Sequence, residues 1–190
     1  LQELDAPKIK KTLPKYLTLE ESLKLLKAVD GKFKERDYCI LTLFLNCGLR
    51  ISELVGLNIN DIQGESLRVL GKGNKVRIIY LNDACQNAIQ QYLSVRRPIR
   101  GKDENALFLS MQNRRMAVRS VENLVKKYAS RVTTLKKITP HKLRSTYGTN
   151  LYRETGDIYL VADVLGHKDV NTTRKHYATI QEDRRKMAAR

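Results

Sequence analysis

The residues of this chain best suited to chemistry are histidines, arginines and a tyrosine in its C-terminal part. All of its histidines lie within residues 141–190, and histidine is the side chain whose charge changes most readily near neutral pH. His141 and Arg144 are three residues apart at the start of a predicted helix, so they share one helix face. Tyr177 follows His167 by ten residues. This region therefore combines proton donors, an anion-binding guanidinium and a hydroxyl group.

Two basic residues further upstream extend this set. Arg50 comes directly after a predicted core helix that ends at Gly48, and Lys72 is predicted at the tip of a β-hairpin. Two guanidiniums can bind the non-bridging oxygens of a phosphodiester and offset the charge of its transition state. A tyrosine hydroxyl can attack the phosphorus when a base and cations assist it, and a lysine or histidine can protonate the departing sugar oxygen. The set is thus typical of phosphoryl transfer without a metal.

A mainly helical domain with one small antiparallel β-sheet is expected to position these residues. Thr18 and Glu21 form a capping box that begins the first helix, and Thr139 followed by Pro140 begins a later one. Alternating apolar and polar residues on both sides of a glycine-rich turn predict a β-hairpin within residues 60–81. Helices are predicted over residues 18–30, 35–47, 52–55, 82–95, 118–130, 139–154 and 158–165.

The composition narrows the classes of function. The chain has 190 residues, with 36 Lys and Arg against 20 Asp and Glu, a net charge of +16 that favours a polyanionic partner. Nucleic acid is the first choice and an anionic membrane surface the second. A hydrophobic content of 42% argues against disorder, and no apolar run approaches the roughly 20 residues that span a bilayer. Three cysteines without CxxC spacing argue against a disulfide framework or a cysteine-based zinc site, and they are expected to be ordinary buried residues.

Several well-known motifs are absent. There is no P-loop, no dinucleotide-binding fingerprint, no HExxH, no EF-hand loop and no Gly-x-Ser-x-Gly elbow. The order and spacing of five segments instead resemble a tyrosine recombinase, most closely the Xer and phage-type integrase branch. The resemblance covers essentially the whole chain. The segments are Gly48-Leu49-Arg50-Ile51-Ser52-Glu53-Leu54, Gly71-Lys72-Gly73-Asn74-Lys75, His141-Lys142-Leu143-Arg144, Leu165-Gly166-His167 and Tyr177.

The resemblance implies a role for each basic residue of the set. Arg50 and Arg144 would bind the scissile phosphate, and His167 would donate a hydrogen bond to it. Lys72 would be the general acid toward the leaving 5′ oxygen. His141 would be the general acid or base near the nucleophile.

The resemblance also implies the nucleophile and its surroundings. Tyr177 would attack and form a 3′-phosphotyrosyl link, with neither metal nor ATP nor any other cofactor. Glu53 matches the family's acidic accessory residue and would orient a neighbouring active-site group. Lys75, Arg114 and Arg115 are expected to contact DNA, although sequence alone does not separate such contacts from solvated charges.

The expected function is site-specific recombination of double-stranded DNA, either integration and excision or the resolution of chromosome dimers. The alternatives are a type IB topoisomerase-like relaxing enzyme and a non-catalytic basic DNA-binding module. The resemblance implies a homo-tetramer on DNA, no membrane contact, and a cytoplasmic, nucleoid-associated location in a bacterium. Residues 1–17 are expected to be the remnant of a linker to an N-terminal domain, residues 18–180 the catalytic domain, and residues 181–190 a tail that packs on a neighbouring protomer.

Overall fold

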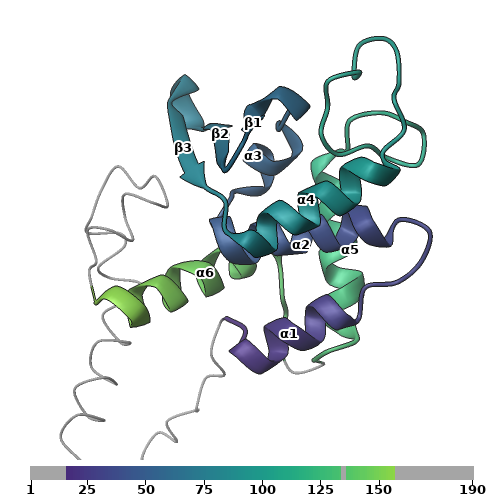
Figure 1. Cartoon of the computed structure of the whole chain (residues 1–190). Helices are drawn as coiled ribbons and strands as arrows, with labels where there is room; N and C mark the ends of the chain where they lie inside the picture. Colours follow the sequence, from purple (N-terminus) through teal and green to yellow (C-terminus); the bar gives the residue numbers. More distant parts are fainter. Residues whose placement is uncertain (1–15, 134–135, 157–190) are drawn as a thin grey trace, which may run out of the picture.

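The computed structural model describes residues 16–133 and 136–156. This part of the chain is mostly helical and carries one small antiparallel sheet, as predicted (Figure 1). Its α-helices and strands, in chain order, are α1 (Leu19–Lys27), α2 (Lys34–Cys47), α3 (Ile51–Val55), β1 (Ile62–Gln63), β2 (Ser66–Leu70), β3 (Val76–Tyr80), α4 (Asp83–Val95), α5 (Val118–Ser130) and α6 (Pro140–Thr155). Short 3₁₀ turns cover Ile59–Asp61 and Lys72–Asn74.

The ends of several helices lie where local sequence signals place them. The Thr18 hydroxyl accepts a hydrogen bond from the Glu21 amide (3.1 Å), and the Glu21 carboxylate accepts one from the Thr18 amide (3.0 Å), so the predicted capping box begins α1. Gly48 ends α2 with a φ of 64°, a left-handed conformation that a residue without Cβ adopts without strain. The Thr139 hydroxyl accepts from the amide of Lys142 (3.3 Å) at the start of α6.

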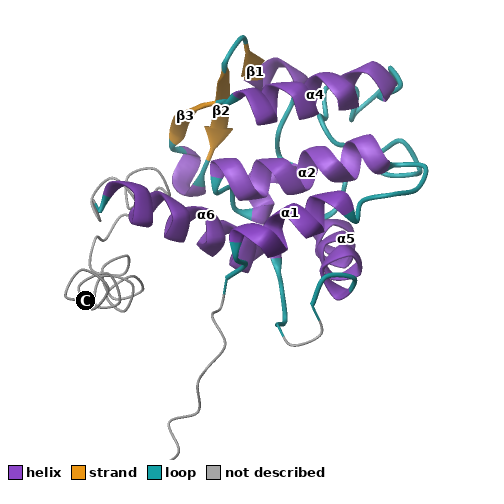
Figure 2. Ribbon diagram, turned by 60° about the horizontal axis from the view of Figure 1, so that its bottom comes forward, coloured by secondary structure: helices purple, strands orange, loops and turns teal. Residues whose placement is uncertain are grey.

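Helix α2 forms the centre of the core. Figure 2 shows it between α4 on one side and α1 and α6 on the other. It can occupy this place because the stretch from Cys39 to Phe44 is buried all round. The cysteines Cys39, Cys47 and Cys85 are buried and free, as predicted. This burial carries the C-terminal end of α2, and the junction that follows it, deep into the domain.

The sheet has the strand order β1-β2-β3, so β1 adds a short third strand to the predicted hairpin. In the β2–β3 pair Leu67 lies opposite Ile79 and Val69 lies opposite Arg77, and these four side chains face the helices. The turn between the two strands is closed by a hydrogen bond from the amide of Gly71 to the carbonyl of Lys75 (2.7 Å). The sheet is therefore apolar on its inner face except at Arg77.

The structured domain begins slightly earlier than the sequence predicts. Leu17, which the sequence assigns to the linker, is 2% exposed, and its amide donates to the Thr146 hydroxyl (3.0 Å). Across residues 16–133 and 136–156, the helices are all too short or too polar to cross a membrane. The helix predicted over residues 158–165, the tail at 181–190, His167 and Tyr177 lie outside the described residues.

Candidate active site

The site is built around the junction between α2 and α3, where Arg50 lies. Arg50 follows the left-handed turn at Gly48 and is the N-cap residue of α3. Its backbone amide donates to Glu53 Oε1 (2.8 Å), and its Nη1 lies 3.8 Å from Glu53 Oε2. The Arg50 side chain is 37% exposed. Its backbone is thus held firmly while its charge stays accessible to a ligand.

Arg144 reaches the same junction from a distant part of the chain. It lies on α6, is 5% exposed, and donates from Nη1 to the carbonyl of Gly48, a residue 96 positions earlier. The packing of α6 against α2 makes this contact possible. The two arginines predicted to bind one phosphate are therefore brought to one place by tertiary packing.

Glu53 is the carboxylate at the centre of this group. Its side chain is buried, and it accepts hydrogen bonds from the Arg50 amide, from Arg77 Nη2 (3.0 Å) and from Arg77 Nη1. Burial raises the pKa of Glu53, but the Arg77 ion pair, the Arg50 amide and the charge of Arg144 outweigh burial and hold the pKa below its usual value. Glu53 is therefore an ionised group that joins the start of α3 to β3.

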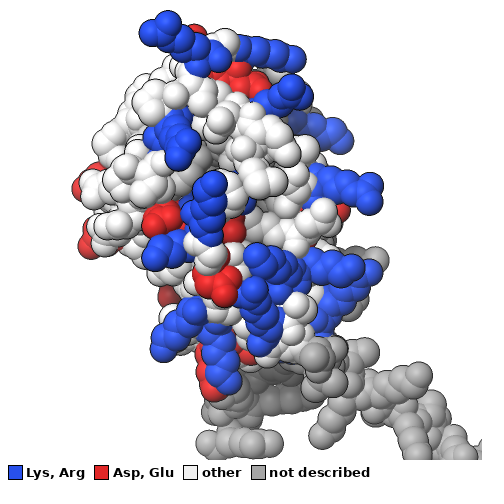
Figure 3. Space-filling view, turned by 90° about the vertical axis from the view of Figure 1, so that its right-hand side faces the viewer, with Lys and Arg blue, Asp and Glu red and all other residues white. Residues whose placement is uncertain are grey.

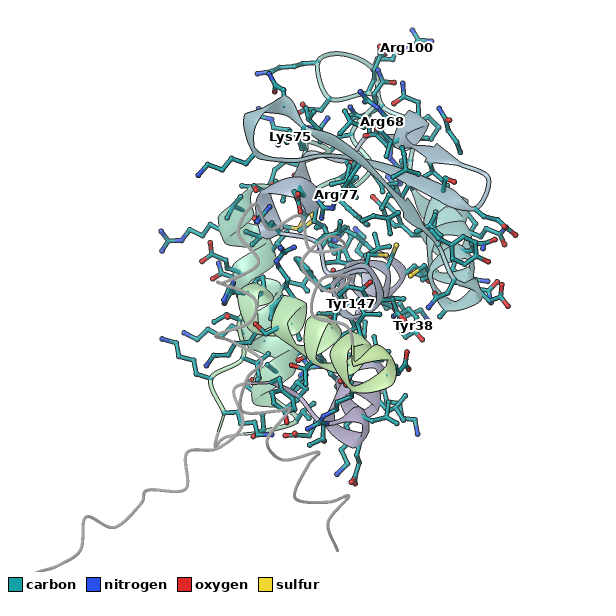
Figure 4. The ribbon with its side chains drawn as sticks, turned by 90° about the vertical axis from the view of Figure 1, so that its left-hand side faces the viewer. Tyr38, Arg68, Lys75, Arg77, Arg100 and Tyr147 are labelled. Atoms are coloured by element: carbon teal, nitrogen blue, oxygen red, sulfur yellow. The ribbon has the colours of Figure 1, made fainter. Side chains whose placement is uncertain are left out.

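The hairpin turn brings Lys72 to this carboxylate. Gly71 packs so closely that a Cβ atom built on it would lie 3.2 Å from Glu53 Oε2 and 3.5 Å from Arg77 Nη1. Lys72 is the next residue, and its side chain is exposed. Figure 4 shows the hairpin end, marked by Lys75, close to Arg77. The predicted general acid thus projects from a loop that is packed onto Glu53.

His141 lies on the other side of the junction. It is exposed in the first turn of α6, one turn before Arg144. Together with Ile51, the first residue of α3, it lines a groove of about 890 Å³ that runs along α5. The groove also carries the basic side chains of Arg119, Lys126 and Lys137 and the acidic Glu122, whereas Lys136 in its wall is paired with Glu21 (2.5 Å). Lys and Arg side chains are spread over the face of the molecule on the α5 side (Figure 3).

The basic residues Lys75, Arg114 and Arg115, which the sequence analysis named as DNA contacts, have different surroundings. Lys75 is exposed at the hairpin turn. Arg115 is half-buried and donates to the carbonyls of Val55 and Leu57 (both 2.9 Å) and to Asn58 Oδ1 (2.5 Å). Arg115 thus fixes its own loop to the end of α3 rather than presenting its guanidinium to solvent.

Arg114 lies far from the junction. It is exposed in the turn that follows Leu109, and the Leu109 carbonyl accepts from Arg36 Nη1 (2.9 Å) near the start of α2. Gly48 lies at the opposite end of this 14-residue helix, which corresponds to a separation of about 20 Å along the helix. Arg114 therefore does not belong to the group around Glu53.

Three tyrosines of the described part are unsuited to act as the nucleophile. Burial raises the pKa of Tyr92, of Tyr128 to about 12 and of Tyr147 to about 12, whereas a nucleophile needs a stabilised phenolate. Tyr147 lies on α6 three residues after Arg144, and its ring is held among the helices (Figure 4). The predicted nucleophile Tyr177 and the predicted phosphate ligand His167 lie outside the described residues.

Arg77 and Arg119 were not singled out from the sequence. Arg77 alternates with exposed Val76 and Ile78 and shares the inner face of β3 with Ile79. The sequence does show that Arg77 lies two positions before Ile79, so both side chains point to the same face of the strand. This identifies Arg77 as an inward-facing charge only once the structure shows that this face is buried. Arg119 stands near the start of α5, where nothing in the local sequence distinguishes it from other surface arginines.

Comparisons with known proteins identify the family of the chain. Residues 15–184 match the sequence profile of the phage integrase family. The tyrosine recombinase XerC of Caldanaerobacter subterraneus subsp. tengcongensis is 53% identical over 175 residues, which cover 91% of this chain and 50% of that protein. The chain thus spans about half the length of this curated relative.

Two solved structures share the fold. The crystal structure of XerA recombinase is 30% identical with a TM-score of 0.78, covering 90% of this chain and 60% of that one. The XerH site-specific recombinase, crystallised with its difH substrate as a pre-cleavage complex, is 25% identical with a TM-score of 0.75, covering 87% of this chain and 51% of that one.

Proposed function

The chain belongs to the phage integrase family, and we propose that it is the catalytic domain of a site-specific tyrosine recombinase that cleaves and rejoins double-stranded DNA. The observation that carries the proposal is the meeting of Arg50 and Arg144 at the α2–α3 junction. Neighbouring guanidiniums suit the non-bridging oxygens of one phosphodiester. The accessible side chain of Arg50 leaves room for such a ligand.

The proposed reaction exchanges one phosphodiester for another. The Tyr177 oxygen forms a bond to phosphorus while the bond from phosphorus to the 5′ oxygen breaks, which leaves a 3′-phosphotyrosyl link. The tyrosine proton passes to His141 acting as base, and Lys72 gives a proton to the departing 5′ oxygen. Arg50 and Arg144 offset the negative charge that grows on the phosphoryl oxygens. A second DNA end with a free 5′ hydroxyl reverses the steps.

Several features of the described residues support these roles. Lys72 is exposed on a loop that packs against Glu53, and His141 is exposed one turn before Arg144 on the same helix. The groove that begins at His141 offers cations to a DNA backbone along α5. We extend the proposal to Lys75 as a backbone contact. Arg115 has its hydrogen bonds inside the protein, so we do not propose such a role for it.

The proposed setting of the reaction follows from the same resemblance. We propose double-stranded DNA as the partner and four protomers on two duplexes as the active assembly. A protein acting on chromosomal DNA in this way would work in the bacterial cytoplasm at the nucleoid.

The test is covalent capture of DNA. The chain is incubated with a pool of nicked duplexes randomised across the cleavage region, and adducts that survive denaturation are isolated and sequenced. We expect an adduct for the wild type and none for Tyr177→Phe. Tyr147→Phe is the matched control, because it removes a hydroxyl from a half-buried tyrosine of α6, and it should still form the adduct.

Two results would contradict the proposal. An adduct that persists in Tyr177→Phe would show that this residue is not the nucleophile. Relaxation of any supercoiled plasmid without sequence preference would favour the topoisomerase-like alternative over site-specific recombination.

A further inference from the structure

Arg77 is an inward-facing charge in a sheet whose other inner residues are apolar. Its side chain is 19% exposed and forms a two-pronged ion pair with Glu53. We propose that Arg77 is a positioning residue for strand cleavage: through Glu53 it holds the loop of Lys72 and the backbone of Arg50 in one fixed arrangement. The inference rests on the proposed recombinase function and adds a residue to the machinery.

The contacts of the Glu53 carboxylate show how one group joins two elements. Oε1 accepts from the Arg50 amide (2.8 Å) and from Arg77 Nη2 (3.0 Å). Oε2 accepts from Arg77 Nη1 and lies 3.8 Å from Arg50 Nη1. Both oxygens therefore face the start of α3 and β3 at the same time, and the orientation of the carboxylate depends on Arg77.

The hairpin loop is tied to the same carboxylate at both of its ends. On one side Gly71 packs beside the carboxylate, and a Cβ atom built on it would lie 3.2 Å from Glu53 Oε2, a tight contact that a shift of a few tenths of an ångström would relieve. On the other side Arg77 follows the loop by two residues and bonds to Glu53 directly. The loop is closed by the bond from Gly71 to Lys75 (2.7 Å). The position of Lys72 within it therefore depends on the ion pair.

The chemistry of the pair favours arginine at this position. A guanidinium presents two parallel N–H groups that match both oxygens of a carboxylate, whereas an ammonium group is a point charge. Lysine would keep the charge but could not hold the carboxylate in one plane. Loss of the charge would leave a buried carboxylate with fewer partners, and Glu53 would be expected to reorient.

Two substrates separate positioning of Lys72 from general support of the fold. One is a normal cleavage duplex, and the other carries sulfur in place of the bridging 5′ oxygen. A thiolate leaves without protonation because thiols have a pKa of about 8.5, so the sulfur substrate does not need the proton from Lys72. Single-turnover rates of adduct formation are measured for wild type, Arg77→Met, Arg77→Lys and Arg68→Met.

Arg68→Met is the matched control. Arg68 lies in the same sheet, is exposed on its outer face and pairs with Asp61 at 3.6 Å. Its rates should stay within about twofold of wild type on both substrates, as expected for an exposed ion pair. Far-UV circular dichroism and equilibrium DNA binding establish that each variant is folded.

We expect Arg77→Met to slow cleavage of the oxygen substrate about 100-fold, the scale of a lost or misplaced general acid. Cleavage of the sulfur substrate should be slowed by a factor at least ten times smaller than that for the oxygen substrate. Arg77→Lys should cleave the oxygen substrate faster than Arg77→Met does. If Arg77→Met does not fold, the rates of Arg77→Lys on the two substrates are compared instead. Equal slowing on both substrates would overturn the inference that Arg77 positions Lys72, and no slowing on either would overturn the inference as a whole. A wild-type protein that cleaves neither substrate would instead overturn the proposed function.

Discussion

Replacement of Glu53 by glutamine tests how strongly the carboxylate holds the site together. The change removes the negative charge at the point where the guanidiniums of Arg50, Arg77 and Arg144 gather, with almost no change in shape. Removing one partner of a buried ion pair costs about 3–5 kcal/mol, because the other charge is left uncompensated. Arg77 keeps 19% of its side chain exposed, so we expect the lower end of that range, about 3 kcal/mol.

Urea unfolding followed by far-UV circular dichroism measures this loss. The chain contains no tryptophan, and its helices give the signal instead. With a denaturant slope of about 2 kcal/mol/M, the loss lowers the unfolding midpoint by about 1.5 M. Glu20→Gln is the matched control, because Glu20 pairs with Lys24 at 3.3 Å on the exposed surface of α1. It should change the free energy of unfolding by less than about 0.5 kcal/mol.

The pH dependence gives the result that would refute the reasoning. Burial raises the pKa of Glu53, but its hydrogen bonds and arginine neighbours lower the pKa by more than burial raises it, so the folded-state pKa lies below the usual 4.5. The ionised carboxylate therefore stabilises the fold above pH 4.5, and this contribution is lost as the pH falls through the folded-state pKa. The stability gap between wild type and Glu53→Gln should narrow below that pH. Two results would refute the role of the ionised Glu53 carboxylate in stability. One is a stability gap that keeps its size in acid, and the other is a loss of stability at neutral pH no larger than the loss caused by Glu20→Gln.

Three further variants probe other parts of the structure. Gly71→Ala should leave the free energy of unfolding within about 1 kcal/mol, because the backbone there is extended. It should slow adduct formation, because its Cβ would lie 3.2 Å from Glu53 Oε2; an unchanged rate would count against the packing described. Lys75→Ala should weaken DNA binding and reduce the slope of log affinity against log salt by about 0.9 if it contacts a phosphate. Fluorescence anisotropy at several salt concentrations measures this, and an unaltered slope would exclude the contact. Tyr128→Phe removes a hydrogen bond to buried Asp37 (2.8 Å), so the free energy of unfolding should fall by about 1–3 kcal/mol. Urea unfolding measures that fall, while the cleavage rate per folded molecule should not change.

Local sequence signals determined the helices and the order of the chemical groups. The Thr18 hydroxyl accepts a hydrogen bond from a backbone amide three residues away, and Gly48 adopts a left-handed backbone conformation because it has no Cβ. Both effects are local, so the neighbouring sequence is enough to predict them. The spacing of the recombinase-like segments was also visible, because it is a property of the chain alone. The fold class, the family and the identity of Arg50, Lys72 and Arg144 as candidates could therefore be predicted without coordinates.

The relations among those groups were decided by tertiary structure. Arg144 bonds to Gly48 across 96 residues, and no local pattern encodes that contact, because it depends on how α6 packs against α2. The same holds for Arg115, whose hydrogen bonds to Val55, Leu57 and Asn58 join residues nearly 60 positions apart. The alternation of side chains along a strand predicts that Arg77 and Ile79 share a face. That this face is buried depends on how β3 pairs with β2 and packs on the helices beneath. The sequence by itself thus supplied the candidates for binding and transferring a phosphate. Folding alone decided that Arg77 and Glu53 would hold two of them in place, because their contact joins elements that are separate along the chain.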